Sequence, residues 1–158
     1  MTIQVGDTMP SGVLKVMGEK GPQDLPTAEI FEGKKVVLFA VPGAFTPGCS
    51  MTHLPGFVVQ ADTIKGKGVD SIVCLSVNDA FVMDAWGKNQ NADEIIMAAD
   101  GSGKYTAALG LELDLTEMGL GVRSKRYAVI VDNGKVTYLG VDAKEIKESS
   151  AEAVLAQL

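Results

Sequence analysis

A short apolar segment that runs into a Pro-Gly turn and then a cysteine restricts how this chain can fold. Residues 35–40 (Lys-Val-Val-Leu-Phe-Ala) are β-branched or apolar after the lysine, as expected for a buried strand. Pro42 and the glycine after it end this strand. Thr46 is a favourable N-cap and Pro47 suits the first helical position, so a helix is predicted to begin there. On this register Cys49 lies in the first helical turn.

A cysteine at that position is suited to nucleophilic chemistry. Free backbone N–H groups and the positive end of the helix dipole favour the thiolate, which is the reactive form of cysteine. Gly48 leaves the approach to the sulfur open, and the Thr46 hydroxyl is expected close to it. The alternative is a small buried cysteine that happens to lie near a helix end. Because the strand end, turn, cap and cysteine all agree, we favour a reactive Cys49.

The residues around this cysteine carry a family resemblance. Pro42, Thr46 and Cys49 match the motif P-x-x-x-T-x-x-C, and the match continues through His53-Leu54-Pro55-Gly56-Phe57. The chain resembles the type II (atypical, thioredoxin-fold) peroxiredoxins of the Redoxin superfamily. This resemblance implies an α/β protein with a thioredoxin-like fold, in which helices flank a central mixed sheet that carries an N-terminal strand extension.

The resemblance also implies an activity. A type II peroxiredoxin is a thiol peroxidase that reduces hydrogen peroxide and organic hydroperoxides through a sulfenic acid, here on Cys49, in antioxidant defence and redox homeostasis. Pro42 would shield the sulfur from water and shape the pocket. The resemblance implies no metal, haem, flavin or other cofactor. Glutaredoxin with glutathione, or thioredoxin, would be the reductant, and a homodimer is expected, with Phe45, Phe81 and Trp86 as candidates for an exposed apolar patch.

Two arginines precede the strand predicted at 127–131. A solvated basic cluster is the commoner fate of such a run, but a guanidinium beside Cys49 would stabilise the thiolate and bind peroxide oxygens. The string Arg123-Ser124-Lys125-Arg126-Tyr127 resembles a type II segment. From this resemblance we expect Arg123 to be the catalytic arginine and Arg126 to be supporting or on the surface.

His53 and Cys74 are weaker candidates. His53 lies four residues after Cys49 and shares a helix face with it. We expect it to orient its neighbours or pack at a contact, in preference to forming a cysteine–histidine ion pair. Cys74 lies in an apolar strand, where a core role is the default. Animal type II members place a resolving cysteine near the C-terminus, and residues 144–158 contain none, which favours a one-Cys cycle over a resolving Cys74.

Composition narrows the remaining possibilities. The 158 residues fit a single domain over 1–158. A chain of that size buries about 70% of the surface that it exposes when unfolded, so it does not need disulfide bonds for stability. The net charge of -6 does not favour binding to nucleic acid. No apolar run is nearly as long as a segment that spans a membrane. Two cysteines and one histidine are too few for a disulfide framework or a zinc site. We see no signal peptide and expect the cytoplasm, or an organelle if a transit peptide has been removed.

Strand-like and helix-like segments alternate along the chain. A helix is predicted over 47–65, interrupted at Pro55-Gly56 because proline ends or kinks a helix. A second buried strand at 71–77 then implies a parallel pair with a right-handed crossover. Other elements are predicted at 3–20 (an edge hairpin or loose strands), 27–31 (a turn or helical stub), 80–88 (helix), 94–98 (strand), 104–109 (helix), 127–131 and 135–141 (a hairpin around Asp132-Asn133-Gly134), and after Ser149 or Ser150 (a capped helix).

Two rival functions fit the same fold class. A thioredoxin-like disulfide reductase usually needs Cys-x-x-Cys, but position 46 is Thr and position 52 is also Thr. A redox-gated chaperone or binding module is the non-enzymatic rival. Neither rival requires Thr46 or Arg123, and consumption of hydrogen peroxide with dithiothreitol separates both from a peroxidase.

Overall fold

The computed structural model describes residues 2–158. Its main strands are β1 (Val13–Gly18), β2 (Gly21–Pro26), β3 (Lys35–Val41), β4 (Ser71–Ser76), β5 (Ile96–Ala99), β8 (Arg126–Asp132) and β9 (Lys135–Asp142). Its α-helices are α1 (Thr27–Phe31), α2 (Leu54–Gly66), α3 (Ala80–Asn89), α4 (Lys104–Leu109) and α5 (Ala151–Ala156). A two-stranded ribbon, β6 (Glu112–Leu115) and β7 (Gly121–Ser124), encloses a short 3₁₀ turn at Thr116–Met118.

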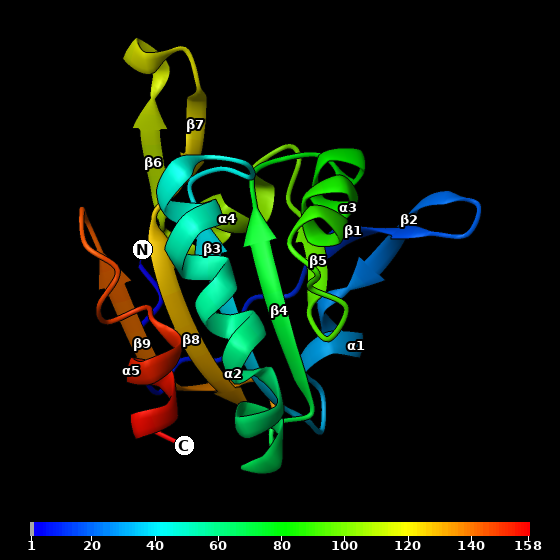
Figure 1. The fold of residues 1–158 in the computed structure, drawn as a ribbon. Coiled ribbons are helices and arrows are strands. Elements are labelled where there is room, and N and C mark those ends of the chain that lie inside the picture. The colour runs from blue at the N-terminus through cyan, green and yellow to red at the C-terminus, as the bar shows by residue number, and fades with distance from the viewer. Residues whose placement is uncertain (1) are drawn as a thin grey trace.

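The main strands form one mixed sheet in the order β2-β1-β5-β4-β3-β8-β9 (Figure 1). Strands β3, β4 and β5 run parallel, whereas β8 runs antiparallel to β3 and β9 antiparallel to β8. The β1–β2 hairpin lies at the other edge. A mixed sheet flanked by helices, with an N-terminal hairpin added, is the thioredoxin-like architecture that the sequence predicted.

Alternation along the central strand divides the core into two layers. Val37, Phe39 and Val41 face α2, α3 and α5, while Val36, Leu38 and Ala40 face α1 and α4. All six side chains are fully buried, which is why this strand is an unbroken apolar run. The sheet therefore fixes the position of the loop that follows Val41.

Antiparallel pairing brings the start of β8 to the end of β3. Ala40 pairs with Tyr127, so Arg126 lies beside the point where β3 runs into the Pro42 loop. The β6–β7 ribbon projects from the same end of the molecule as the N-terminal end of α2 (Figure 1). This end of the sheet therefore carries Arg126 and the Pro42 loop, both of which the sequence analysis singled out.

The structure differs from the sequence-based prediction in three places. The edge hairpin that was expected within residues 3–20 is formed by β1 and β2, so its second strand lies after the predicted segment. Helical residues begin at Pro47 as predicted, but Cys49–His53 form a π-helical turn, and α2 then runs without a break through Pro55-Gly56. The ring nitrogen of Pro55 cannot donate an α-helical hydrogen bond, and the wider turn lies directly before it. The β6–β7 ribbon was not predicted, because each strand has only four residues, too few for the alternation in Glu112–Leu115 to stand out as a strand signal.

Candidate active site

Cys49 lies in the first turn of the helical segment, as its spacing from Thr46 predicted. The carbonyl of Thr46 accepts a hydrogen bond from the backbone N–H of Ser50 at 2.9 Å, which closes the first turn. The N–H of Leu54 then bonds to the Cys49 carbonyl, five residues back, and this bond defines the π turn. The Cys49 side chain is fully buried in this conformation.

The Thr46 hydroxyl lies between two acceptors. Its Oγ1 is 2.6 Å from the Gly43 carbonyl and 2.9 Å from the Cys49 Sγ. A hydroxyl has one proton to donate. With a neutral thiol, the S–H group can donate to Oγ1 while Oγ1 donates to Gly43. With a thiolate, the Thr46 proton can turn to the sulfur, so this side chain suits either ionisation state.

Arg126 supplies a permanent positive charge beside the sulfur. Its Nη2 lies 3.2 Å from the Cys49 Sγ, and the side chain is half-buried at the start of β8. The interpretation of Arg126 as a supporting or surface residue was therefore wrong. A Cβ added at Gly48 would lie 3.3 Å from this same Nη2, so the absence of a side chain at Gly48 gives the guanidinium its room.

Arg123 does not contact Cys49, contrary to the prediction that its guanidinium would reach the sulfur. It belongs to the β6–β7 ribbon, where it pairs with Leu113, and its Nε donates to the Leu120 carbonyl at 2.8 Å. Its Nη1 lies near the active-site loop, 3.2 Å from where a Cβ at Gly43 would stand. Arg123 therefore lies beside the loop that carries Thr46, while Arg126 lies at the sulfur itself.

His53 is buried and bonded through both ring nitrogens. Nε2 lies 2.8 Å from the Ser149 carbonyl and Nδ1 lies 3.0 Å from the Nη1 of Arg126. Burial lowers the pKa of His53 to about 4; the Arg126 charge also lowers it, while the Ser149 bond and the Asp142 charge act to raise it. The ring is therefore neutral near pH 7, with its proton on Nε2, since a carbonyl only accepts. No contact joins His53 to the Cys49 sulfur directly.

Further contacts hold the active-site loop, and two of the residues that make them, Asn78 and Ser50, were not singled out in the sequence analysis. The Asn78 Oδ1 accepts a hydrogen bond from the Ala44 backbone at 3.0 Å and tethers the loop to the start of α3. The Trp86 indole donates to the Ser50 hydroxyl at 2.9 Å. Phe45 has a φ of 64°, which is unusual for a residue with a side chain. Pro42 is half-buried immediately after β3.

Cys74 lies in the core. It occupies the middle of β4, in register with Phe39, and is fully buried. Burial raises the pKa of the Cys74 thiol well above its ordinary value, and the nearby Cys49 acts in the same direction. Both cysteines are free thiols. In this conformation Cys74 is therefore a neutral and inaccessible thiol.

The predicted aromatic patch is only partly present. Phe45 and Phe81 are 52% and 63% exposed, but Trp86 is fully buried. The rings of Phe45 and Trp86 lie 6.4 Å apart in a tilted arrangement. Of the three predicted aromatic residues, Phe45 in the active-site loop and Phe81 in α3 are thus exposed, whereas Trp86 is buried.

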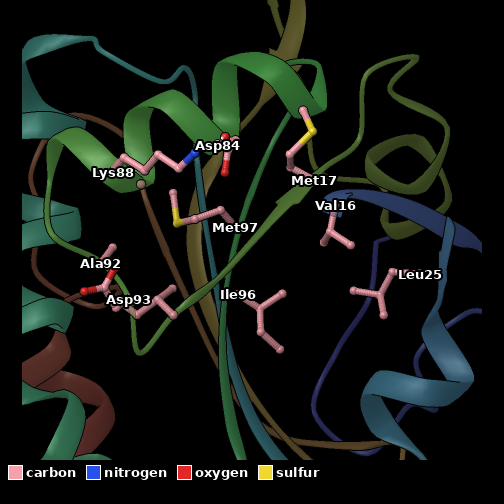
Figure 2. Close-up of a pocket in the computed structure, with 11 residues that line it drawn as sticks. Val16, Met17, Leu25, Asp84, Lys88, Ala92, Asp93, Ile96 and Met97 are labelled. Carbon is pink, nitrogen blue, oxygen red and sulfur yellow. Dashed lines mark ion pairs between the residues drawn. The ribbon is translucent and has the colours of Figure 1, made fainter. Parts of the chain in front are cut away.

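A separate hollow lies between α3, β1 and β5 (Figure 2). Its lining is mainly aliphatic, and its charged groups include Asp84 and Lys88, which pair with each other at 3.0 Å. It contains no cysteine, histidine or arginine, so it offers no nucleophile for the chemistry described above. Among residues 2–158, no three histidine, cysteine or acidic side chains cluster as a metal site would require.

Comparison with known proteins gives the family. The Redoxin family model matches residues 4–155. The chain is 52% identical to Peroxiredoxin-2D of Arabidopsis thaliana, an alignment that covers 99% of this chain and 98% of the relative. The chain belongs to the Redoxin family, among its type II peroxiredoxins. As a peroxiredoxin it is a thiol peroxidase, the enzyme class that the motif predicted.

Further relatives of this peroxiredoxin agree. It is 46% identical to Peroxiredoxin-2E, chloroplastic, of Arabidopsis thaliana, over 99% of this chain and 70% of the relative. It superposes on reduced Prx3 in complex with H₂O₂ from Vibrio vulnificus with a TM-score of 0.94, at 56% identity, over 98% of each chain. Within residues 2–158, none of the helices has the length and apolar character needed to cross a membrane.

Proposed function

We propose that this peroxiredoxin works as a single-domain enzyme in which Cys49 reduces hydrogen peroxide and organic hydroperoxides. The Cys49 thiolate attacks one peroxide oxygen, the S–O bond forms and the O–O bond breaks. Cys49 becomes a sulfenic acid, and the other oxygen leaves as hydroxide or alkoxide, which takes up a proton. The observation that carries this proposal is the contact of the Cys49 Sγ with both Arg126 and Thr46. The relative that was solved with H₂O₂ bound supports the choice of substrate.

The neighbours of the sulfur have distinct roles in this proposal. Arg126 stabilises the thiolate and, together with the Thr46 hydroxyl and the first-turn N–H groups, the charge that develops on the leaving oxygen. Pro42 limits access of water to the buried sulfur. We assign Arg123 a position at the loop next to Thr46, where its guanidinium can donate hydrogen bonds to an incoming peroxide without touching the sulfur.

We propose a one-Cys cycle with an external reductant. The burial and raised pKa of Cys74 disfavour it as a thiolate that would attack the sulfenic acid, and the chain has no third cysteine. Sulfenic acid and a thiol condense to a mixed disulfide and water, and a second thiol then releases Cys49. Glutaredoxin with glutathione, or thioredoxin, would supply these thiols.

We further propose a homodimer and a cytoplasmic location, with an organelle as the alternative. The exposed Phe45 in the active-site loop and the exposed Phe81 in α3 support the dimer, since aromatic side chains are enriched in protein interfaces. A reducing compartment suits two free thiols. A relative named as chloroplastic is the reason to keep an organelle as the alternative.

The test is consumption of hydrogen peroxide by the purified protein with dithiothreitol. The wild type should consume peroxide and Cys49→Ser should not, whereas Cys74→Ala should retain most of the rate. Mass spectrometry after one equivalent of peroxide should find a trapped sulfenic acid on Cys49 and no Cys49–Cys74 bridge. Turnover by Cys49→Ser would refute the nucleophile, and a Cys49–Cys74 bridge would refute the one-Cys cycle.

A further inference from the structure

The parallel strands β3 and β4 end at the same edge of the sheet, so the segments that follow them lie close together. Val41 pairs with Ser76 at the last position of the shared register. The active-site loop leaves β3 at this point, and Asn78 follows β4 just before α3 begins. The pairing of these two strands therefore brings the Asn78 side chain to the backbone of Ala44, although 34 residues separate them in the chain.

One peptide group of the active-site loop is held at both of its ends. The Ala44 N–H donates to the Asn78 Oδ1 at 3.0 Å. The carbonyl of the same peptide group belongs to Gly43, and its oxygen lies 2.6 Å from the Thr46 Oγ1. Because a peptide group is planar, a bond to its nitrogen fixes the direction of its carbonyl oxygen. The Thr46 Oγ1 lies in turn 2.9 Å from the Cys49 Sγ.

We propose that Asn78 is a positioning residue, which holds the Gly43–Ala44 peptide group so that the Thr46 hydroxyl stays at the Cys49 sulfur. This inference rests on the proposed role of Cys49. A threonine side chain can turn about its Cα–Cβ bond into other staggered positions, and only one of them places the hydroxyl at the sulfur. The Gly43 carbonyl holds the hydroxyl in that position, and Asn78 holds the carbonyl.

The amide of Asn78 is oriented by two hydrogen-bond donors. A backbone N–H can only donate, so the amide atom that faces Ala44 is the oxygen. The Ser76 hydroxyl lies 2.5 Å from the same oxygen and donates to it. Ser76 is fully buried at the end of β4, and its Oγ also lies 3.3 Å from the Val41 carbonyl. The end of the central sheet therefore fixes the amide that holds the loop.

The loop needs an anchor of this kind because its own backbone holds it weakly. The Thr46 N–H closes the turn to the Gly43 carbonyl over 3.4 Å, which is long for a hydrogen bond. Phe45, the third residue of the turn, has a φ of 64°, a region that is unfavourable for a residue with a side chain. Such a conformation persists only where the surroundings hold it, and the bond from Ala44 to Asn78 comes from outside the turn.

The test compares two replacements of similar size at position 78. Leucine removes the acceptor, whereas aspartate keeps an oxygen at the position of Oδ1. We expect Asn78→Leu to lower the second-order rate constant for hydrogen peroxide about tenfold, and Asn78→Asp to recover most of that loss. Each variant is measured at a pH at which its Cys49 is fully ionised, so that the added carboxylate does not change the fraction of thiolate. The pH profile of alkylation by iodoacetamide, with Cys74→Ala as background, gives that pH.

A double-mutant cycle distinguishes positioning of Thr46 from a general structural effect. In Thr46→Val the hydroxyl that Asn78 positions is absent, so adding Asn78→Leu should cost less than about twofold. Independent effects would instead multiply, and the double variant would be about tenfold slower than Thr46→Val alone, which would overturn the proposal. A faster reaction in Asn78→Leu would also overturn it, because the Gly43 carbonyl would then only compete with the sulfur for the Thr46 proton.

Ser76→Ala keeps the proposal falsifiable if Asn78→Leu does not fold. Loss of the hydroxyl that donates to Oδ1 should lower the rate constant about threefold, and this loss should disappear in the Thr46→Val background. The matched control is Asp70→Leu, which removes the acceptor of the Lys35 N–H at the opposite end of β3 and should leave the rate constant unchanged. A wild-type rate in a folded Asn78→Leu, or in Ser76→Ala, would overturn the proposal. Failure of the wild type to consume peroxide would instead refute the proposed function.

Discussion

The Nη2 atom of Arg126 lies 3.2 Å from the Cys49 sulfur, although 77 residues separate the two in the chain. The pairing of β8 with β3 creates this contact, because it brings the start of β8 to the strand end from which the active-site loop leaves. A charge that is built into the sheet is held more firmly than one on a loop. The reactivity that we propose for Cys49 therefore depends on the register of the central sheet.

Gly48 is predicted to be important because it leaves space for the Arg126 guanidinium, and not because of an effect on the helix backbone. In Gly48→Ala the new Cβ would lie 3.3 Å from the Arg126 Nη2, so the guanidinium must shift by a few tenths of an ångström. We expect the second-order rate constant for hydrogen peroxide to fall by about three- to tenfold, since small misplacements of a catalytic group are costly. Stopped-flow fluorescence of the single tryptophan, Trp86, which bonds to Ser50, would follow oxidation.

The matched control for that change is Gly66→Ala at the end of α2, where a Cβ meets no atom within 4 Å. Its rate constant should equal that of the wild type. Equal losses in the two variants would mean that the effect comes from the helix backbone and not from Arg126.

The Thr46 hydroxyl is predicted to act through its single proton. Thr46→Val keeps the shape but removes the donor that lies 2.9 Å from the sulfur, and we expect about a 10²-fold lower rate constant for peroxide. Thr46→Ser keeps the hydroxyl and should stay within about threefold of the wild type. Both variants should keep the native circular dichroism spectrum. A Val variant as fast as the Ser variant would remove Thr46 from the mechanism.

His53 gives the protein a predictable loss of stability in acid. Burial and Arg126 lower its pKa from 6.5 to about 4, while Asp142 and the Ser149 carbonyl oppose them. Between these two pH values the unfolded chain binds a proton that the folded protein does not, so the free energy of unfolding falls as pH falls. The full contribution of His53 to the free energy of unfolding is present above about pH 6.5. Its complete loss near pH 4 lowers this free energy by roughly 3 kcal/mol.

Urea denaturation at pH 7.0, 5.5 and 4.5 would measure this effect. The wild type should lose stability steadily over this range. His53→Gln has no titrating ring and should show a flatter dependence, leaving only the carboxylates, which mostly titrate lower. Parallel pH dependence in the two proteins would show that His53 does not titrate as its burial implies.

The fold and the position of Cys49 in the first helical turn were predictable because they depend on local signals. The apolar run of β3, the Pro-Gly turn and the Thr46-Pro47 helix start together place Cys49 without reference to distant residues. The π turn was not predicted, because Pro55 was taken to interrupt the helix. In the structure the helix continues through Pro55, and its missing N–H follows a wider turn at Cys49–His53.

The prediction that Arg123 reaches the sulfur was wrong, although the strand carried a signal that distinguishes Arg126 from Arg123. Ala128 and Ile130 pack in the layer formed with α2, so Arg126, which has the same parity along β8, faces that helix too. Arg123 lies before the strand and could not be placed by parity, since the β6–β7 ribbon was not recognised. The motif resemblance alone did not distinguish between the two.

The rate constants of Arg126→Gln and Arg123→Gln for hydrogen peroxide, measured side by side with Cys74→Ala as common background, test the central claim most directly. The account predicts a loss of about 10²- to 10³-fold in Arg126→Gln, because the buried sulfur loses its charged donor, and less than about tenfold in Arg123→Gln. A larger loss in Arg123→Gln, or a near-wild-type rate in Arg126→Gln, would contradict it.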